Sequence, residues 1–65
     1  APMTEEQAIE KALEAHPGKV IKAYQETKKG VDTWEVKIKT EEGLVWEVYY
    51  NIADGSLVME EAETD

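Results

Sequence analysis

The feature that most constrains the fold is the stretch of residues 33–59. Apolar and polar side chains alternate along it, and two short glycine-containing breaks divide it into three segments. Alternation with a period of two is typical of a strand that buries one face. Gly43 closes the first break, where a tight turn needs a positive φ angle, and Gly55 closes the second. The stretch therefore predicts two consecutive β-hairpins, with strands at 33–40, 44–51 and 56–59.

The two turns also predict which side chains face each other. If Thr40 lies opposite Leu44, three apolar pairs fall on one side of the sheet: Trp34 with Tyr50, Val36 with Val48, and Ile38 with Trp46. On the other side, Lys37 lies opposite Glu47, which is a favourable cross-strand pair. If Asn51 lies opposite Ser56, Tyr50 meets Leu57 and Val48 meets Met59. A slip of one residue would mix the two faces, so the pattern specifies this register.

A helix is predicted ahead of the hairpins. Thr4 and Gln7 match the capping box, in which the threonine hydroxyl and the glutamine side chain each satisfy a backbone N–H of the first turn. Pro17 cannot continue a helix, so the helix ends near Ala15. Its apolar stripe is narrow and largely small, which lets it lie close to a sheet. The stripe consists of Ala8, Ile9, Ala12 and Leu13.

Residues 20–27 predict a less regular strand, followed by a loop at 28–32. Ile21 and Ala23 are expected to face the core, because the opposite choice would bury Lys22 without a partner. The predicted fold class is α+β, with one N-terminal helix packed on one face of an antiparallel β-meander of three to four strands. Residues 1–3 are expected to be a frayed lead-in, 4–59 a single domain, and 60–65 a disordered acidic tail. The expected inward sheet face consists of Ile21, Ala23, Trp34, Val36, Ile38, Leu44, Trp46, Val48, Tyr50, Leu57 and Met59.

Composition limits the classes of function. A chain of 65 residues makes one small domain, and the absence of cysteine excludes disulfides, thiolate metal sites and a cysteine nucleophile. The formal net charge of −8 argues against binding to nucleic acid or to an anionic membrane surface, because both require a basic face. No run approaches the roughly 20 apolar residues of a membrane span, so direct membrane insertion is not expected.

Four segments, in this order, resemble the PepSY domain: residues 4–9, 16–20, 34–38 and 46–58. That family opens with a Ser/Thr-x-x-Gln/Glu-Ala-Ile helix, has Pro-Gly before its first strand, carries a Tyr-Glu-Val-like central strand and closes with an Asp-x-x-Thr-Gly-Lys-Val hairpin. The resemblance covers residues 4–58. Asn51 departs from the family's usual Asp, and Asp54 from its usual Thr. Both residues suit a turn, but position 51 lacks the family's carboxylate.

The resemblance implies a non-enzymatic bacterial module of an extracytoplasmic compartment, either secreted or anchored in the cell envelope. PepSY domains occur in propeptides of thermolysin-like metallopeptidases, and the role proposed for the family is to inhibit or regulate peptidases. No catalytic residue and no cofactor carries over. The expected function is therefore a protein-binding module with a peptidase as the candidate partner. The alternative is a structural or assembly domain, a homodimer or a spacer, with no peptidase target.

The sheet face opposite the helix supplies the candidate partner-binding residues: Tyr24, Val45, Tyr49 and Val58. An apolar patch on a nominally solvated face marks an interface with a partner or with a second copy. The alternative is a set of scattered apolar residues between charged ones, which is common on protein surfaces. The first and last strands are the predicted sheet edges, to which an extended peptide can add. Lysines on the first strand and Glu60 on the last oppose such pairing.

Three other features are interpreted as structural. His16 has no identifiable nucleophile or orienting partner, and a helix C-terminus favours an imidazole. The glutamates at positions 6, 10 and 14 form a charged helix face that is typical of a solvated surface. The acidic residues 60–65 lack the spacing of a calcium-binding loop. Neither a metal site nor a catalytic site is expected.

Overall fold

The helix begins and ends where the sequence predicts. The computed structural model describes residues 1–64, and α1 spans Glu5–Ala15. The backbone N–H of Gln7 donates to the Thr4 hydroxyl (3.1 Å), and the Thr4 N–H donates to the Gln7 side-chain oxygen (2.9 Å). Both halves of the capping box are therefore present. At the other end, His16 is the C-cap, and its backbone N–H donates to the carbonyl of Ala12 (2.8 Å).

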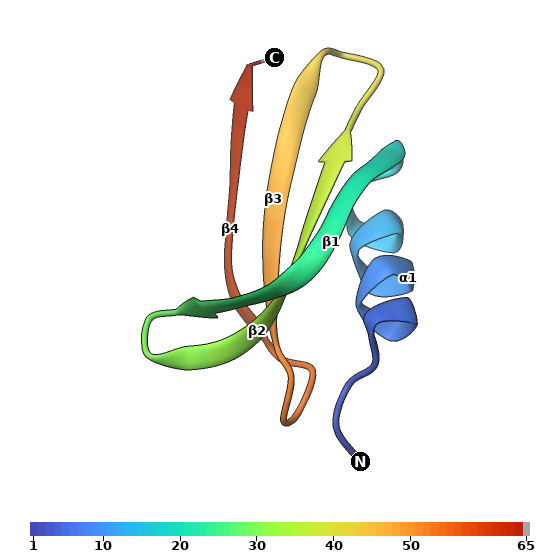
Figure 1. Cartoon of the computed structure of the whole chain (residues 1–65). Helices are drawn as coiled ribbons and strands as arrows, with labels where there is room; N and C mark the ends of the chain where they lie inside the picture. The colour runs from blue at the N-terminus through green and yellow to red at the C-terminus, as the bar shows by residue number, and fades with distance from the viewer. Residues whose placement is uncertain (65) are drawn as a thin grey trace.

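Four antiparallel strands follow in the order β1-β2-β3-β4 (Figure 1). They are β1 (Lys19–Lys28), β2 (Val31–Lys39), β3 (Leu44–Asn51) and β4 (Leu57–Thr64). The predicted α+β class, with an N-terminal helix on one face of a meander, is confirmed. The predicted loop at 28–32 is instead a two-residue turn, because Lys29 and Gly30 both adopt positive φ angles (54° and 74°). A turn of this kind matches the twist of the strands that it joins.

The predicted register between β2 and β3 is confirmed. The structure pairs Trp34 with Tyr50, Val36 with Val48, and Ile38 with Trp46. Lys37 lies opposite Glu47, and its Nζ is 3.8 Å from a carboxylate oxygen of that residue. This central hairpin is therefore the part of the sheet that the alternating pattern specifies completely.

A bulge in β1 overturns one prediction. The register shifts just after Val20, which lies opposite Ile38, whereas Ala23 lies opposite Val36. Ile21 is the extra residue, and it is 48% exposed. The prediction that Ile21 faces the core is therefore wrong, because the inserted residue lets Val20 and Ala23 both point inward.

A second bulge changes the phase of β4. Tyr50 lies opposite Leu57 as predicted, but Tyr49 lies opposite Met59, so Val58 is the extra residue. The predicted pairing of Val48 with Met59 is therefore wrong, and Glu60 takes that place opposite Val48. Strict alternation could not anticipate this shift, because the residues around the bulge still read as a plain strand.

Both ends of the chain are more ordered than predicted. β4 continues to Thr64 because residues 60–64 pair with β3, so the prediction of disorder there is wrong. Asp65 lies outside the described residues. The lead-in is also anchored, because the N–H of Met3 donates to the carbonyl of Ile52 (2.7 Å) and the indole N–H of Trp34 donates to the carbonyl of Met3 (2.8 Å).

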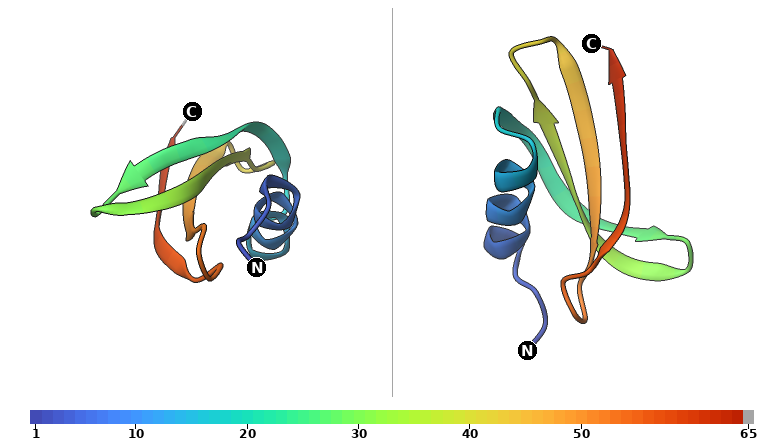
Figure 2. Two further views of the ribbon diagram at one scale, coloured as in Figure 1. Left: turned by 60° about the horizontal axis from the view of Figure 1, so that its bottom comes forward. Right: turned by 180° about the vertical axis from the view of Figure 1, so that it is seen from behind.

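The core lies between α1 and the inward face of the sheet (Figure 2). Its buried members are Ala8, Ala12, Val36, Ile38, Val48 and Tyr50. Partly buried residues pack around them: Met3, Ile9, Leu13, Val20, Ala23, Trp34 and Trp46. Leu44, Leu57 and Met59 were also predicted for the core but lie outside this cluster, and Leu57 is 51% exposed. For Met59 the reason is the bulge at Val58, which places it opposite Tyr49 on the other face of the sheet. For Leu57 the reason is that α1 packs on β1 and β2, which leaves the last strand without a helix above it.

Candidate functional site

We call the sheet face opposite α1 the outer face. The registers place Tyr24, Val45 and Tyr49 there, because they pair with outward residues of β2. Glu35 lies between the two tyrosines in the sheet, opposite Tyr24 on one side and Tyr49 on the other. Val58 occupies the bulge of β4 beside Met59, which is the partner of Tyr49. The outer face therefore combines residues from all four strands.

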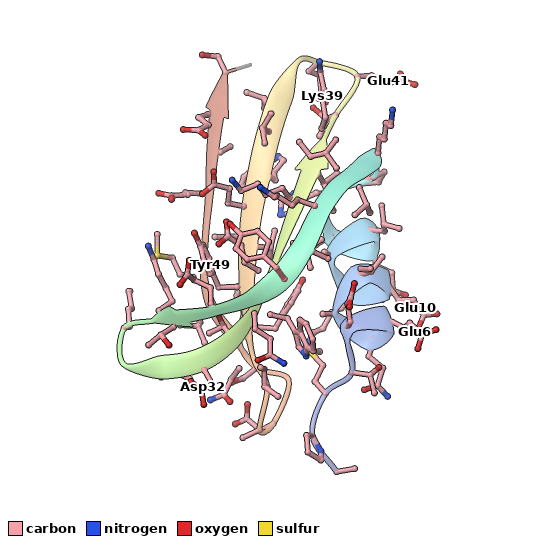
Figure 3. All side chains as sticks on the ribbon, in the orientation of Figure 1. Glu6, Glu10, Asp32, Lys39, Glu41 and Tyr49 are labelled. Atoms are coloured by element: carbon pink, nitrogen blue, oxygen red, sulfur yellow. The ribbon has the colours of Figure 1, made fainter. Side chains whose placement is uncertain are left out.

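The outer face is more buried than a solvated sheet face. Tyr49 is only 4% exposed, Glu35 only 3%, and Val45 is also buried, whereas Tyr24 and Val58 are half-buried. The cause is the strong twist of the sheet, since the end of the β1–β2 hairpin bends across this face (Figures 1 and 2). Tyr49 lies beside the point where β1 crosses β3 (Figure 3). Tyr49 and Val45 therefore form a floor, and Tyr24 and Val58 keep accessible surface.

Charged side chains surround the two tyrosines. The hydroxyl of Tyr49 donates to a carboxylate oxygen of Glu47 (3.3 Å), and the Nζ of Lys28 lies 5.0 Å from the centre of the Tyr49 ring. The Nζ of Lys22 lies 5.5 Å from the centre of the Tyr24 ring. These are cation–π distances. Tyr49 is thus held by contacts to side chains of β1 and β3.

Burial and the neighbouring glutamates keep both tyrosines protonated. Burial, followed by a hydrogen bond to Glu35 and the charge of that residue, raises the pKa of Tyr24 to about 12. Burial, followed by the charges of Glu35 and Glu47, raises the pKa of Tyr49 well above its usual range. Each effect disfavours the phenolate, by desolvation or by repulsion. At neutral pH the two hydroxyls are therefore hydrogen-bonding groups and not bases.

A loss of stability at alkaline pH follows from these shifts. The ordinary tyrosine pKa is 10.0, and the values of Tyr24, Tyr49 and Tyr50 are all raised in the folded protein. Above pH 10 the unfolded chain therefore releases protons that the folded chain still holds. The stabilisation is complete below about pH 10 and should be lost as the pH rises toward 12 and beyond.

The measurement is the urea midpoint as a function of pH, together with tyrosinate absorbance. A variant with Tyr24→Phe and Tyr49→Phe should lose less stability over the same pH range. Tyrosinate absorbance that rises with the ordinary pKa while the domain stays folded would contradict the burial of these rings.

His16 contacts two side chains, one of which is a carboxylate partner that the sequence did not predict. Its ring stacks on Trp46, with 3.9 Å between ring centres and 15° between planes, and its Nε2 lies 2.7 Å from a carboxylate oxygen of Glu60. Sequence reasoning missed this partner because Glu60 reaches the helix side only through the bulge in β4. The contact ties the end of α1 to β4.

Other polar features lie around the helix and the β3–β4 turn. A groove of about 740 Å³ lies between α1 and the β3–β4 turn, with Met3 and Leu13 among its lining residues. Lys11 lies in this groove, and its Nζ donates to the carbonyl of Gly55 (2.6 Å). Glu6 and Glu10 point away from the sheet (Figure 3). Among residues 1–64, no three His, Asp or Glu side chains gather as they would around a metal ion.

Sequence reasoning also missed the burial of Glu35 on the outer face. The available signal was its predicted position opposite Tyr49, since a phenolic hydroxyl can satisfy a buried carboxylate; the second tyrosine, Tyr24, is placed opposite Glu35 only by the structure. Thr33 was missed as well. It is fully buried, and its hydroxyl donates to the carbonyl of Glu26 (2.7 Å).

Comparison with known proteins gives one family match. The sequence model of the family PepSY, described as peptidase propeptide and YPEB domain, matches residues 2–58. No curated protein and no solved structure matches the chain. The matched region contains α1, β1, β2, β3 and the first two residues of β4. Within the described residues, α1 is too short and too polar to cross a membrane.

Proposed function

The chain belongs to the PepSY family, and on that basis we propose that it is a protein-binding module that inhibits or regulates a peptidase in an extracytoplasmic compartment. PepSY domains are propeptide or regulatory modules and not catalytic ones, which fits a non-enzyme. The partner in this proposal is a peptidase of the thermolysin-like class, because the family occurs in the propeptides of those enzymes.

The observation that carries the proposal is the construction of the outer face. Tyr49 is a large aromatic residue buried on the side of the sheet that no helix covers, and Lys28 and Glu47 hold it in place. A surface that is already fixed loses little conformational entropy when a partner binds. Tyrosine is also enriched in the central parts of interfaces. In this proposal Tyr24 and Val58 contact the partner directly, and Tyr49 and Val45 support them.

The test compares two double variants. Tyr24→Ser with Val58→Ser should weaken inhibition of a thermolysin-type zinc metallopeptidase at least about tenfold, because Tyr24 lies on the outer face, Val58 lies in the adjoining bulge, and both side chains are only half-buried. Ile21→Ser with Leu57→Ser is the matched control, since it removes two exposed apolar side chains from elsewhere on the sheet. The control should inhibit like the parent chain. Equal inhibition by all three proteins, or none by the parent, would overturn the proposal.

A distribution of charge favours the alternative, an assembly domain that pairs with a second copy. On the outer face Lys22 lies opposite Lys37, and Glu47 lies opposite Glu61. Like charges in such pairs are unfavourable within one chain. A second copy turned by 180° would place lysines against glutamates, as a two-fold interface requires. Sedimentation that shows a dimer in the parent chain, and a monomer in the Tyr24/Val58 variant, would support this alternative.

A further inference from the structure

We propose that the outer edge of β4 is a docking site for an extended, basic segment of a partner protein, which would add to the sheet as a fifth strand. This inference concerns backbone pairing at the edge of the sheet, although the side chains of Glu61 and Glu63 lie on the outer-face side of that edge, and it does not depend on the partner being a peptidase. It also lies outside the family match, which ends at residue 58 and so does not account for the glutamates of residues 60–63.

The geometry of β4 permits strand addition. β4 is the last strand of the sheet, α1 packs on β1 and β2, and residues 60–64 are exposed. Figure 2 shows the outer edge of β4 clear of the helix. From Met59 to Thr64 the pairing with β3 is uninterrupted. In such a strand alternate backbone N–H and C=O groups point away from the neighbouring strand, where an added chain can bind them.

The two edges of the sheet differ in how they resist pairing. The β1 edge carries the bulge at Ile21 and several lysines, and α1 packs beside it. Bulges and lysines are devices that block strand addition. By contrast, β4 has neither lysine nor proline, and its bulge at Val58 lies near its beginning. Its glutamates oppose pairing with an acidic strand but favour pairing with a basic one. The second half of β4 is therefore the edge that is open to an extended chain.

The glutamates on β4 favour a partner segment that carries positive charges. Glu61 lies opposite Glu47, an unfavourable like-charge pair, and Glu63 lies two residues further along the same face. Lys37 reaches only Glu47, and within residues 1–64 neither Glu61 nor Glu63 forms an ion pair. A cation opposite each of these glutamates would relieve the repulsion.

The same charges exclude the simplest self-association through this edge. Pairing β4 of one copy with β4 of another would place glutamates against glutamates, and the whole chain carries a net charge of −8. Side chains on one face of an added strand are two residues apart. The occupant that fits is therefore an extended segment of another protein with lysine or arginine at alternate positions, facing Glu61 and Glu63.

The experiment is a titration of the full chain, labelled with ¹⁵N, with a short peptide that alternates lysine and threonine. Amide shifts should be confined to β4 and its partner β3, and amide exchange along residues 59–64 should slow. Glu61→Lys with Glu63→Lys should weaken binding at least about tenfold. The matched control, Glu6→Lys with Glu10→Lys, makes the same change in net charge on the exposed face of α1 and should bind like the parent.

A second peptide separates strand addition from charge attraction alone. A peptide that alternates lysine and proline has the same charge but lacks half of the backbone N–H groups, so it should bind much more weakly. Equal binding of the two peptides, equal weakening by the two double variants, or shifts centred on β1 would each overturn the proposal. Concentration-dependent shifts without peptide that are centred on residues 59–64 would also overturn it, by showing that a second copy occupies the edge.

Discussion

Replacing Tyr49 with serine is expected to destabilise the domain by about 3–5 kcal/mol, the usual cost of removing a buried aromatic ring. The ring is 4% exposed on the outer face, where Lys28 at the end of β1 lies over it. The loss also leaves Glu47 without the hydroxyl that donates to it. Because small domains have total stabilities of only about 5–15 kcal/mol, a substantial part of the fold's stability depends on this residue.

The measurement is the free energy of unfolding from urea denaturation. Tyr49→Phe is the matched control, because it keeps the ring and removes only the hydroxyl, with an expected loss of about 1 kcal/mol. A serine variant that unfolds within about 1 kcal/mol of the parent would mean that the ring is not buried in solution. Because the Tyr49→Ser variant is expected to be unstable, binding to the outer face is better tested by substituting Tyr24 and Val58. These side chains are less buried, so their replacement should cost less stability.

Replacing Gly18 with alanine is the second large effect, with an expected loss of about 2–3 kcal/mol. A β-carbon at this position would lie 2.5 Å from the carbonyl oxygen of Lys39 and 2.9 Å from a methyl group of Ile38. Ile38 is fully buried, and the oxygen belongs to the backbone of β2, so neither atom can move without displacing the strand. Gly18 is therefore required by the close approach of two chain segments.

Gly43→Ala is the control that separates the effect of the close contact at Gly18 from the effect of backbone strain. Gly43 has a φ angle of 87°, but a β-carbon there would meet no atom within 4 Å. Its replacement should cost only about 1–2 kcal/mol, the penalty of a positive φ angle for a residue with a side chain. Urea denaturation of both variants checks the comparison. If the loss at Gly18 did not exceed the loss at Gly43, the close contact with β2 would not be what fixes this glycine.

The parts of the fold that sequence predicted are those in which a local rule decides the structure. The hydroxyl of Thr4 and the side chain of Gln7 fix the start of α1, and the alternation around Val36 and Val48 fixes the central hairpin. The bulges at Ile21 and Val58 were not predicted, because each lies in a run of consecutive apolar residues that does not show which residue is the inserted one.

The length of β4 was missed for a related reason. A run of glutamates has low strand propensity, but pairing with β3 from Val48 to Leu44 supplies backbone hydrogen bonds that composition does not reveal. Propensity is a weak guide wherever a neighbouring strand is already in place.

For the candidate site, sequence predicted the direction of the side chains but not their burial. The register alone places Tyr24, Val45 and Tyr49 on the outer face. The twist of the sheet then covers Tyr49 and Glu35, and the rotation between neighbouring strands accumulates over all four strands. The division of the outer face into a buried floor and an accessible rim therefore became visible only in three dimensions.

The bulge at Val58 also determines which glutamates of β4 point toward the helix side of the sheet and which point toward the outer face. With the extra residue in place, Glu60 turns toward His16, whereas Glu61 and Glu63 turn toward the outer face. Removing one uncharged residue there would reverse the side of the sheet toward which each of these glutamates points, and the net charge would stay the same. A change of length by one residue at this point is thus a route by which chains of nearly the same composition can present different surfaces to their partners.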